Sequence, residues 1–259
     1  MNTVLSFPGI QQISSMFYSG LPRHVEAGKG AWAKRETSLG RIGYKVENIL
    51  DLSGQVRWNE LLLSPPWVTT VASYLSELTA NWRWTFALAK RVIEKASVLA
   101  QGDDILYFVN LFAQDFSEKL LHSTPKNWQG IVLEVVETKE LTAENVRVMI
   151  ELRKRWYQIA LDDYPLTVSK NNHMRYHLEL LLNAGISPIV KIDGKDIQWM
   201  IGRGERKELK KNLTNLQQRT QWILVAEWAK MSHLPILESL EVKNLLAQWR
   251  ELRSYWHTQ

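Results

Sequence analysis

The stretch QIALDDYP, Gln158–Pro165, sets two aspartates side by side at the end of an apolar run. A short run of this kind predicts a strand, and the proline marks where the strand stops. Aspartate favours the start of a helix, so Asp162 and Asp163 could be a helix cap and its neighbour. Adjacent carboxylates also repel each other unless cations neutralise them, so the pair could instead belong to a charged site.

Similar apolar runs recur from Arg41 onward, and longer segments of helical period separate them. Apolar residues three and four apart mark those segments as amphipathic helices. The strand-like runs cover residues 46–52, 55–63, 104–112, 130–137, 157–163, 188–193 and 222–228. The main helical segments cover residues 70–99, 142–156, 173–185 and 206–220. This alternation is typical of repeated βα units over a parallel sheet, and it predicts an α/β fold.

The first forty residues differ from the rest of the chain. They carry scattered Gly, Pro and Ser without a sustained period, so we predict an N-terminal extension over residues 1–40. Residues 41–259 contain no sequence repeat and no obvious linker, which predicts one domain. A chain of 259 residues with 45% hydrophobic content can bury a large core, and a single barrel of about 250 residues is within range.

Composition excludes several kinds of protein. The chain has no cysteine, which excludes a disulfide framework, a thiolate metal site and a cysteine nucleophile, and favours a cytoplasmic protein. Its longest apolar runs are far shorter than the ~20 residues of a membrane span, and the N-terminus lacks the pattern of a signal peptide, so no membrane is expected. A net charge of +5 is compatible with an anionic partner without specifying one.

Polar residues recur at the ends of the predicted strands. They are Glu60, Asn110, Glu134, Glu137, Asp162, Asp163, Lys191, Asp193 and Glu227. From Asn110 through Glu134, Asp162 and Lys191 to Glu227, the successive gaps are 24, 28, 29 and 36 residues. These gaps are close to the ~31 residues expected when about 250 residues form eight βα units. The spacing therefore predicts a TIM-type (β/α)8 barrel whose polar residues converge on the rim that carries active sites.

The chemistry of such a rim follows from its oxygen atoms. Carboxylate and amide oxygens suit a hard cation such as Mg²⁺ or Mn²⁺. Two cations roughly 3.5 to 4 Å apart can clamp the attacking and leaving oxygens of a phosphodiester. A lysine nearby can orient the attacking water or stabilise charge on the phosphate. Phosphodiester cleavage is the reaction class that this set indicates.

Six segments resemble the EAL domain, a family of cyclic-di-GMP phosphodiesterases built on a TIM-type barrel. They are ILDLSGQVRWNELLL (49–63), FVNLFAQDF (108–116), LEVVETKEL (133–141), IALDDYP (159–165), PIVKIDGKDI (188–197) and LVAEWAK (224–230). They occur in the family's order and at plausible spacing, from about Tyr44 to Glu227. The resemblance implies a barrel of the EAL kind after the N-terminal extension, with Mg²⁺ or Mn²⁺ as cofactor and cyclic-di-GMP as ligand.

The resemblance also implies a role for each matching residue. The implied metal ligands are Glu60, Asn110, Glu134 and Asp162, with Asp163 at a second metal and its water. Lys191 would contact that water, Glu227 would hydrogen-bond near the lysine, and Glu137 would brace the loop after the aspartates. Gln248 would match the glutamine of a late QGY segment.

Some positions depart from the family pattern. Ser64 stands where an arginine binds substrate phosphate, Glu47 where glutamine is usual, and Trp228 where the family has a glycine. The sequence YPLTVSKNN follows the aspartates in place of a glycine-rich loop, which removes glycine's access to positive φ. We assign Glu47, Ser64 and Gln248 to substrate binding.

Two functions stay open from these residues. The first is a metal-dependent phosphodiesterase that opens cyclic-di-GMP to linear pGpG. The second is a degenerate EAL protein that senses cyclic-di-GMP or binds a protein partner as a regulator, for example of motility or biofilm genes. A homodimer is open in both cases, and a nucleic-acid polymer is not an expected partner.

Two other patterns have simpler interpretations. His173 and His177 are four residues apart, but no acidic partner completes a known zinc pattern, so we expect a solvated pair. The basic stretch RGERKELKK (203–211) predicts a solvated helix face, with Leu209, Leu213 and Leu216 turned inward.

Overall fold

The structure is a computed structural model of the 259-residue chain. It describes residues 43–64, 82–101, 105–124, 130–136, 140–167, 172–220, 223–229 and 231–249. The predicted N-terminal extension therefore lies outside the described residues, and so does Glu137. The described part falls within one compact unit, Ile42–Gln259.

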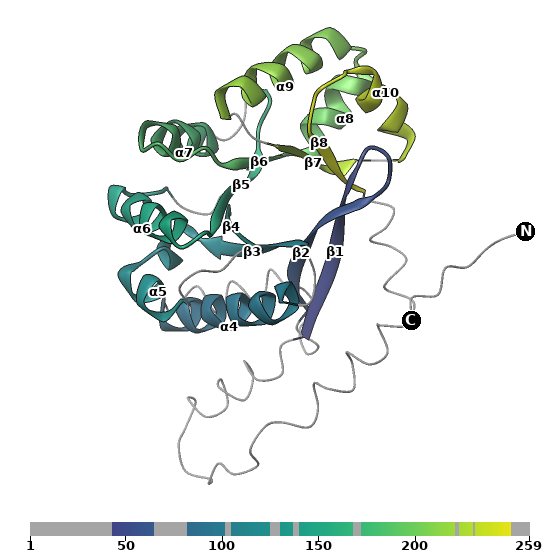
Figure 1. Ribbon diagram of the computed structural model, residues 1–259. Helices are drawn as coiled ribbons and strands as arrows, with labels where there is room; N and C mark the ends of the chain where they lie inside the picture. The colour runs from purple at the N-terminus through teal and green to yellow at the C-terminus, as the bar shows by residue number, and fades with distance from the viewer. Residues whose placement is uncertain are drawn as a thin grey trace, which may run out of the picture. The chain divides into compact units, whose positions relative to one another are not determined.

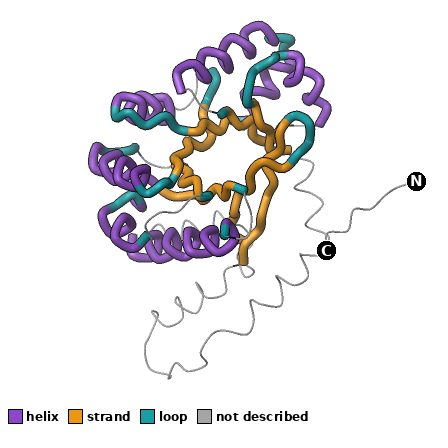
Figure 2. The backbone as a smooth tube through the Cα atoms, viewed as in Figure 1, coloured by secondary structure: helices purple, strands orange, loops and turns teal. Residues whose placement is uncertain are grey.

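In this part of the chain, eight strands close into a barrel, and helices lie around its outside (Figures 1 and 2). The strands are β1 (Gly43–Asp51), β2 (Val56–Ser64), β3 (Leu106–Phe112), β4 (Ile131–Val136), β5 (Gln158–Tyr164), β6 (Ile189–Ile192), β7 (Leu224–Ala229) and β8 (Leu245–Trp249). The α-helices are α4 (Trp82–Ala100), α5 (Glu118–Ser123), α6 (Ala143–Lys154), α7 (Asn172–Asn183), α8 (Gly194–Gly202), α9 (Arg206–Thr220) and α10 (Leu234–Ser239). Short 3-10 turns are η1 (Ala113–Asp115) and η2 (Met231–His233). The predicted TIM-type fold class is confirmed.

Strand β1 is the exception to a parallel sheet. It pairs antiparallel with both β2 and β8, whereas neighbours from β2 to β8 pair in parallel. The expectation of a uniformly parallel sheet is therefore wrong for β1. The reason is the short turn Leu52–Gln55, in which Gly54 adopts φ 86°. Parallel strands need a crossover of a dozen or more residues, so a turn this short permits only an antiparallel pair.

Strand β8 closes the barrel, and the sequence patterns did not predict it. Its five residues lie parallel to β7 and antiparallel to β1, where Ala247 pairs with Leu50. A short apolar run that contains a glutamine has no clear period, which is why the pattern was missed.

The barrel interior contains one layer of apolar side chains with a contribution from every strand. In strand order these are Ile49, Trp58, Phe108, Val132, Ala160, Ile189, Val225 and Leu246. The rings of Trp58 and Phe108 lie 5.4 Å apart between centroids. The polar residues of the rim lie next to this apolar layer, two residues away along each strand.

Outside the barrel, the basic helix α9 agrees with its predicted packing. Leu209, Leu213 and Leu216 are buried, and most of the charged residues of the helix are exposed. Among the described residues, no helix has both the length and the hydropathy needed to cross a membrane.

Candidate active site

Side-chain alternation places the candidate site directly above the apolar layer. Residues two apart on a strand face the same side, so each apolar layer residue has a companion one step nearer the rim. In strand order the companions are Glu47, Glu60, Asn110, Glu134, Asp162, Lys191, Glu227 and Gln248. Because β1 runs in the opposite direction, its companion Glu47 precedes Ile49 in the chain, whereas the other companions follow. Every member of this rim layer was predicted from the sequence as a site residue.

Lys191 lies at the centre of the rim layer. Its side chain is 1% exposed, and its Nζ contacts four carboxylates from four different strands. The distances from Nζ are 2.6 Å to Glu134 Oε1, 2.8 Å to Glu227 Oε1, and 3.3 Å to both Glu60 Oε2 and Asp162 Oδ1. One ammonium group therefore faces four carboxylates.

Amide side chains flank Glu60 on both sides. Asn110 Nδ2 donates to Glu60 Oε1 at 2.8 Å, and Gln248 Nε2 donates to Glu60 Oε2 at 2.7 Å. Glu47 lies directly opposite Glu60 in the β1–β2 pair, where two carboxylates repel each other. Gln248 Nε2 also donates to Glu47 Oε2 at 3.0 Å, and Lys45 Nζ pairs with Glu47 Oε1 at 2.8 Å. These contacts reduce the repulsion between the two glutamates.

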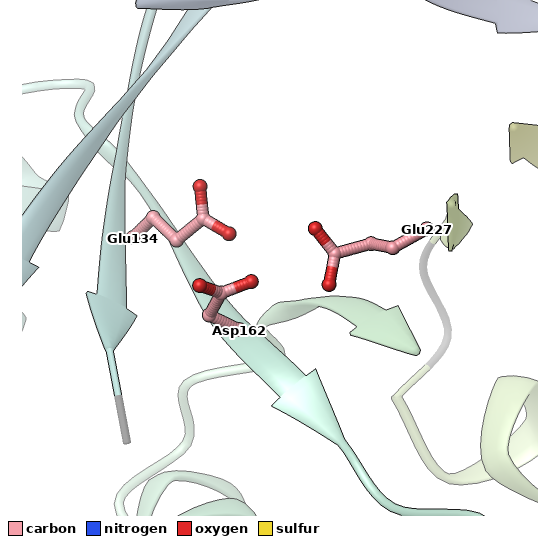
Figure 3. Close-up of side chains that lie close together, drawn as sticks. All are labelled: Glu134, Asp162 and Glu227. Atoms are coloured by element: carbon pink, nitrogen blue, oxygen red, sulfur yellow. The ribbon is translucent and has the colours of Figure 1, made fainter. Parts of the chain in front are cut away.

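Three carboxylates form the most compact acidic group. Glu134, Asp162 and Glu227 each offer an oxygen, and these oxygens lie within 4.8 Å of one another. Figure 3 shows the three groups turned toward a common space from β4, β5 and β7. Such a cluster, taken from the described residues, could hold a metal ion.

The pKa values of the rim residues reflect an excess of carboxylates over positive charge. Burial, reinforced by the charge of Asp162, raises the pKa of Glu134 and of Glu227 well above the usual value. Burial is the largest influence on Asp162 and acts to raise its pKa, but the Lys191 charge and the side-chain hydrogen bonds of Asp162 together outweigh it, so the pKa is lowered. For Lys191, burial is the largest influence and opposes the charged form, yet the charges of the four carboxylates together outweigh it and the pKa rises well above normal. The lysine therefore stays positively charged, and its single charge does not neutralise the four carboxylates that surround it.

Several oxygens in the site have unused capacity. Asn110 Oδ1, Glu134 Oε2 and Glu227 Oε2 are buried and accept no hydrogen bond. Buried acceptors without donors are costly, and all of these atoms are hard oxygen ligands. The donor set thus fits a divalent cation such as Mg²⁺ or Mn²⁺.

Asp163 differs from its neighbour Asp162. The register of β5 against β6 shifts between Leu161 and Tyr164, and Asp163 adopts φ 45°. Its N–H donates to Asp162 Oδ1 at 3.0 Å. Burial, followed by the charges of Asp162 and Asp193, raises the pKa of Asp163. Aspartate tolerates this left-handed conformation better than most residues, so the strand can form a bulge at Asp163 without a glycine.

Three other positions singled out in the sequence are not part of the rim layer. Ser64 is exposed at the end of β2. Glu137 and the side chain of Trp228 lie outside what the structure describes.

The expected solvated histidine pair is wrong for His177. That side chain is fully buried on α7, and its Nε2 accepts the N–H of Leu141 at 3.0 Å. Burial lowers the pKa of His177 to about 4. His173 is exposed and lies 3.1 Å from Glu140. The signal was present, because His177 shares the apolar face formed by Met174, Leu178 and Leu181.

Comparison with known proteins rests on structure alone. No family model matches the chain, and no curated protein matches its sequence. An EAL-domain protein from Listeria monocytogenes EGD-e superposes with a TM-score of 0.66 at 14% identity, covering 90% of this chain and 100% of that one. This chain has the EAL-domain fold.

Two ligand complexes of EAL-fold proteins are also similar. The PaMucR phosphodiesterase in complex with cyclic-di-GMP gives a TM-score of 0.62 at 17% identity, covering 85% of this chain and 95% of that one. BlrP1 from Klebsiella pneumoniae, in a complex with manganese and cyclic-di-GMP, gives 0.61 at 17% identity over 88% of this chain and 56% of that one. The predicted EAL resemblance is thus confirmed as a shared fold.

Proposed function

We propose that this EAL-fold protein is a phosphodiesterase that opens cyclic-di-GMP to linear pGpG with Mg²⁺ or Mn²⁺. The observation that carries the proposal is the rim layer, in which four carboxylates surround one buried lysine and leave oxygen acceptors unused. The shared fold with cyclic-di-GMP complexes supports the same substrate.

The cation ligands are Glu60, Asn110, Glu134 and Asp162, with Asp163 beside a second cation. When bound, the cations supply a Lewis acid and a water of lowered pKa. Asn110 donates to Glu60 through its Nδ2 only. Its Oδ1 accepts no hydrogen bond and can therefore bind the cation.

Lys191 stabilises negative charge and does not act as a base. Its raised pKa keeps Nζ protonated at neutral pH, so Nζ can donate to the attacking water or to a phosphoryl oxygen. Glu227 holds the lysine at 2.8 Å and fixes the direction of that donation. Glu137 is proposed to brace the loop beside the aspartates.

Substrate binding falls to the β1, β2 and β8 side of the rim. The buried carboxylate of Glu47 can accept from a guanine N–H edge, and Gln248 positions that carboxylate. Ser64 replaces an arginine of the family, and the missing charge-assisted contact is worth about 1.5–3 kcal/mol of phosphate binding.

A second candidate function is binding without turnover. Ser64 and the non-glycine segment after Asp163 favour it, since both alter substrate contacts while the cation ligands are kept. In that case the protein would sense cyclic-di-GMP or bind a protein partner that controls motility or biofilm genes. A homodimer and a cytoplasmic location are part of the proposal in either case.

One assay separates the candidates. Purified protein is incubated with cyclic-di-GMP and Mn²⁺ or Mg²⁺, and the nucleotides are separated by chromatography. We expect pGpG from the wild type and none from Glu134→Gln or Lys191→Met. Calorimetry follows if no product forms, because binding of cyclic-di-GMP without turnover would support the sensor. If the wild type forms no product and binds no cyclic-di-GMP, both cyclic-di-GMP functions are refuted.

A further inference from the structure

The segment Tyr164–Thr167 follows the aspartate pair without any glycine. Asp163, just before it, is already left-handed at φ 45°, a conformation that persists only where surrounding contacts hold it. Leu166 is buried in this segment. Some other part of the fold must therefore keep the segment in place.

The side chain of Asp196 provides that hold. Asp196 lies in the first turn of α8 and is 8% exposed. Its Oδ2 accepts the N–H of Leu166 at 2.8 Å and the N–H of Thr167 at 3.1 Å. The hydroxyl of Thr167 lies 3.3 Å from each oxygen of the same carboxylate. One carboxylate thus satisfies two consecutive backbone donors.

Two further hydrogen bonds tie the same segment to its neighbours. The N–H of Asp193 donates to the carbonyl of Tyr164 at 3.1 Å, and Arg175 Nη2 donates to the carbonyl of Leu166 at 3.2 Å. Asp193 comes two residues after Lys191, just beyond β6, and Asp196 comes five residues after Lys191, in the first turn of α8. The end of β5 is therefore attached to the end of β6 just beyond Asp162 and Lys191.

We propose that Asp196 is a positioning residue, whose carboxylate anchors Tyr164–Thr167 and thereby sets Asp162 and Asp163 against Lys191. The role of these aspartates toward a cation rests on the proposed function, but the anchoring does not. The hydrogen bonds that Asp196 accepts hold a segment that has no glycine, whereas a glycine-rich loop would reach its conformation through glycine's backbone freedom.

Four variants test the inference. Asp196→Ala removes the anchor, Asp196→Asn keeps one acceptor, and Thr167→Val removes only the hydroxyl contacts. Asp51→Ala is the matched control, because Asp51 organises the β1–β2 turn at the other end of the barrel by accepting from Gln55 N at 2.9 Å and from Ser53 Oγ at 2.6 Å.

Two measurements are made on the full chain. Residue-resolved hydrogen exchange without metal reports Leu166, Thr167 and Asp163, whose N–H donates to Asp162 Oδ1. Calorimetry with Mn²⁺ reports the affinity. We expect Asp196→Ala to speed exchange at all three amides and to weaken Mn²⁺ binding about tenfold, as is typical when support behind a ligand is lost. Asp196→Asn and Thr167→Val should follow in decreasing order, and Asp51→Ala should change only the turn at 51–57.

Each outcome decides the inference. Wild-type exchange at Asp163 in Asp196→Ala would overturn it, and so would faster exchange with unchanged Mn²⁺ affinity. If the wild type binds no Mn²⁺, the proposed function fails, while exchange at Asp163 alone still supports or refutes the anchor. If Asp196→Ala does not fold, Asp196→Asn and Thr167→Val give the graded answer.

Discussion

Carboxylate groups serve opposite purposes at the two ends of the barrel. At the β1–β2 turn, Asp51 receives donors from Ser53, Gln55 and Arg57, and its pKa is lowered to about 2, with the Ser53 hydrogen bond the largest cause. At the rim, Glu134 and Glu227 share one lysine with two other carboxylates, and burial raises their pKa values. A carboxylate with matched donors stabilises a turn, whereas an unmatched cluster stores repulsion that a cation can relieve.

The turn end of the barrel also contains a pocket. Near the turn, a pocket of about 420 Å³ is lined largely by apolar side chains, among them Trp58, Ile223 and Leu246. The apolar layer separates this pocket from the polar rim. Changes at one end should therefore leave the other almost unaffected, and the following experiments test that separation.

The largest effect is expected from Lys191→Met. It removes the ammonium group that contacts four carboxylates, three of them buried, and breaking such a pairing typically costs about 3–5 kcal/mol. Urea denaturation at pH 7 should show this loss in unfolding free energy. Adding Glu134→Gln should recover part of it by removing one charge. A stability within about 1 kcal/mol of the wild type would mean that the carboxylates do not need the lysine.

The second prediction concerns pH and Asp115, on the 3-10 turn after β3. Burial raises the pKa of Asp115 to about 6 despite a 2.9 Å hydrogen bond from Phe112 N–H. The folded state then holds a proton that the unfolded state releases above about pH 4. Stability should fall by about 2 kcal/mol as the pH rises from 4 to 6.

Asp51 should give the opposite slope in a lower window. Its pKa of about 2 means that its contribution is present above about pH 4 and is lost as the pH falls toward 2. Urea denaturation across these ranges checks both signs, with Asp115→Asn as the control. An unchanged slope between pH 4 and 6 in Asp115→Asn would assign the dependence to other groups.

A third prediction adds charge to the rim. Ser64→Arg should tighten cyclic-di-GMP binding about 10- to 100-fold, since a charge-assisted phosphate contact is worth about 1.5–3 kcal/mol. Calorimetry measures the affinity, and Ser64→Gln controls for side-chain length. Equal affinities for the two variants would show that position 64 does not face the phosphate.

The smallest effect is expected from Asp51→Asn. Loss of a mostly surface network should lower stability by less than about 1 kcal/mol. Mn²⁺ affinity should stay within about twofold, because distant sites act independently. A tenfold loss of affinity by calorimetry would show that the two ends are coupled.

Much of the site could be predicted from local sequence because strand ends have a simple signal. The polar residues of short apolar runs predicted that Asn110, Glu134 and Asp162 lie near the ends of their strands, and each lies two residues before the last residue of its strand. Convergence then followed from parallel βα repeats without any knowledge of side-chain contacts.

Other features depend on partners that are distant in the chain. The direction of β1 was set by a short turn, and β8 became a strand only by closing the barrel between β7 and β1. The role of Asp196 depends on backbone groups thirty residues earlier, at Leu166. Such contacts leave no period in the sequence, so only the structure shows them.

The apolar layer has an evolutionary consequence for the rim. Slipping a strand by one residue would turn its layer side chain and its rim side chain out of the barrel together. Selection for a packed interior therefore also preserves the alignment of the polar groups, whatever the loops do. Loops such as Tyr164–Thr167 are thus free to diverge from the pattern of the family that the chain resembles, provided that new contacts hold them.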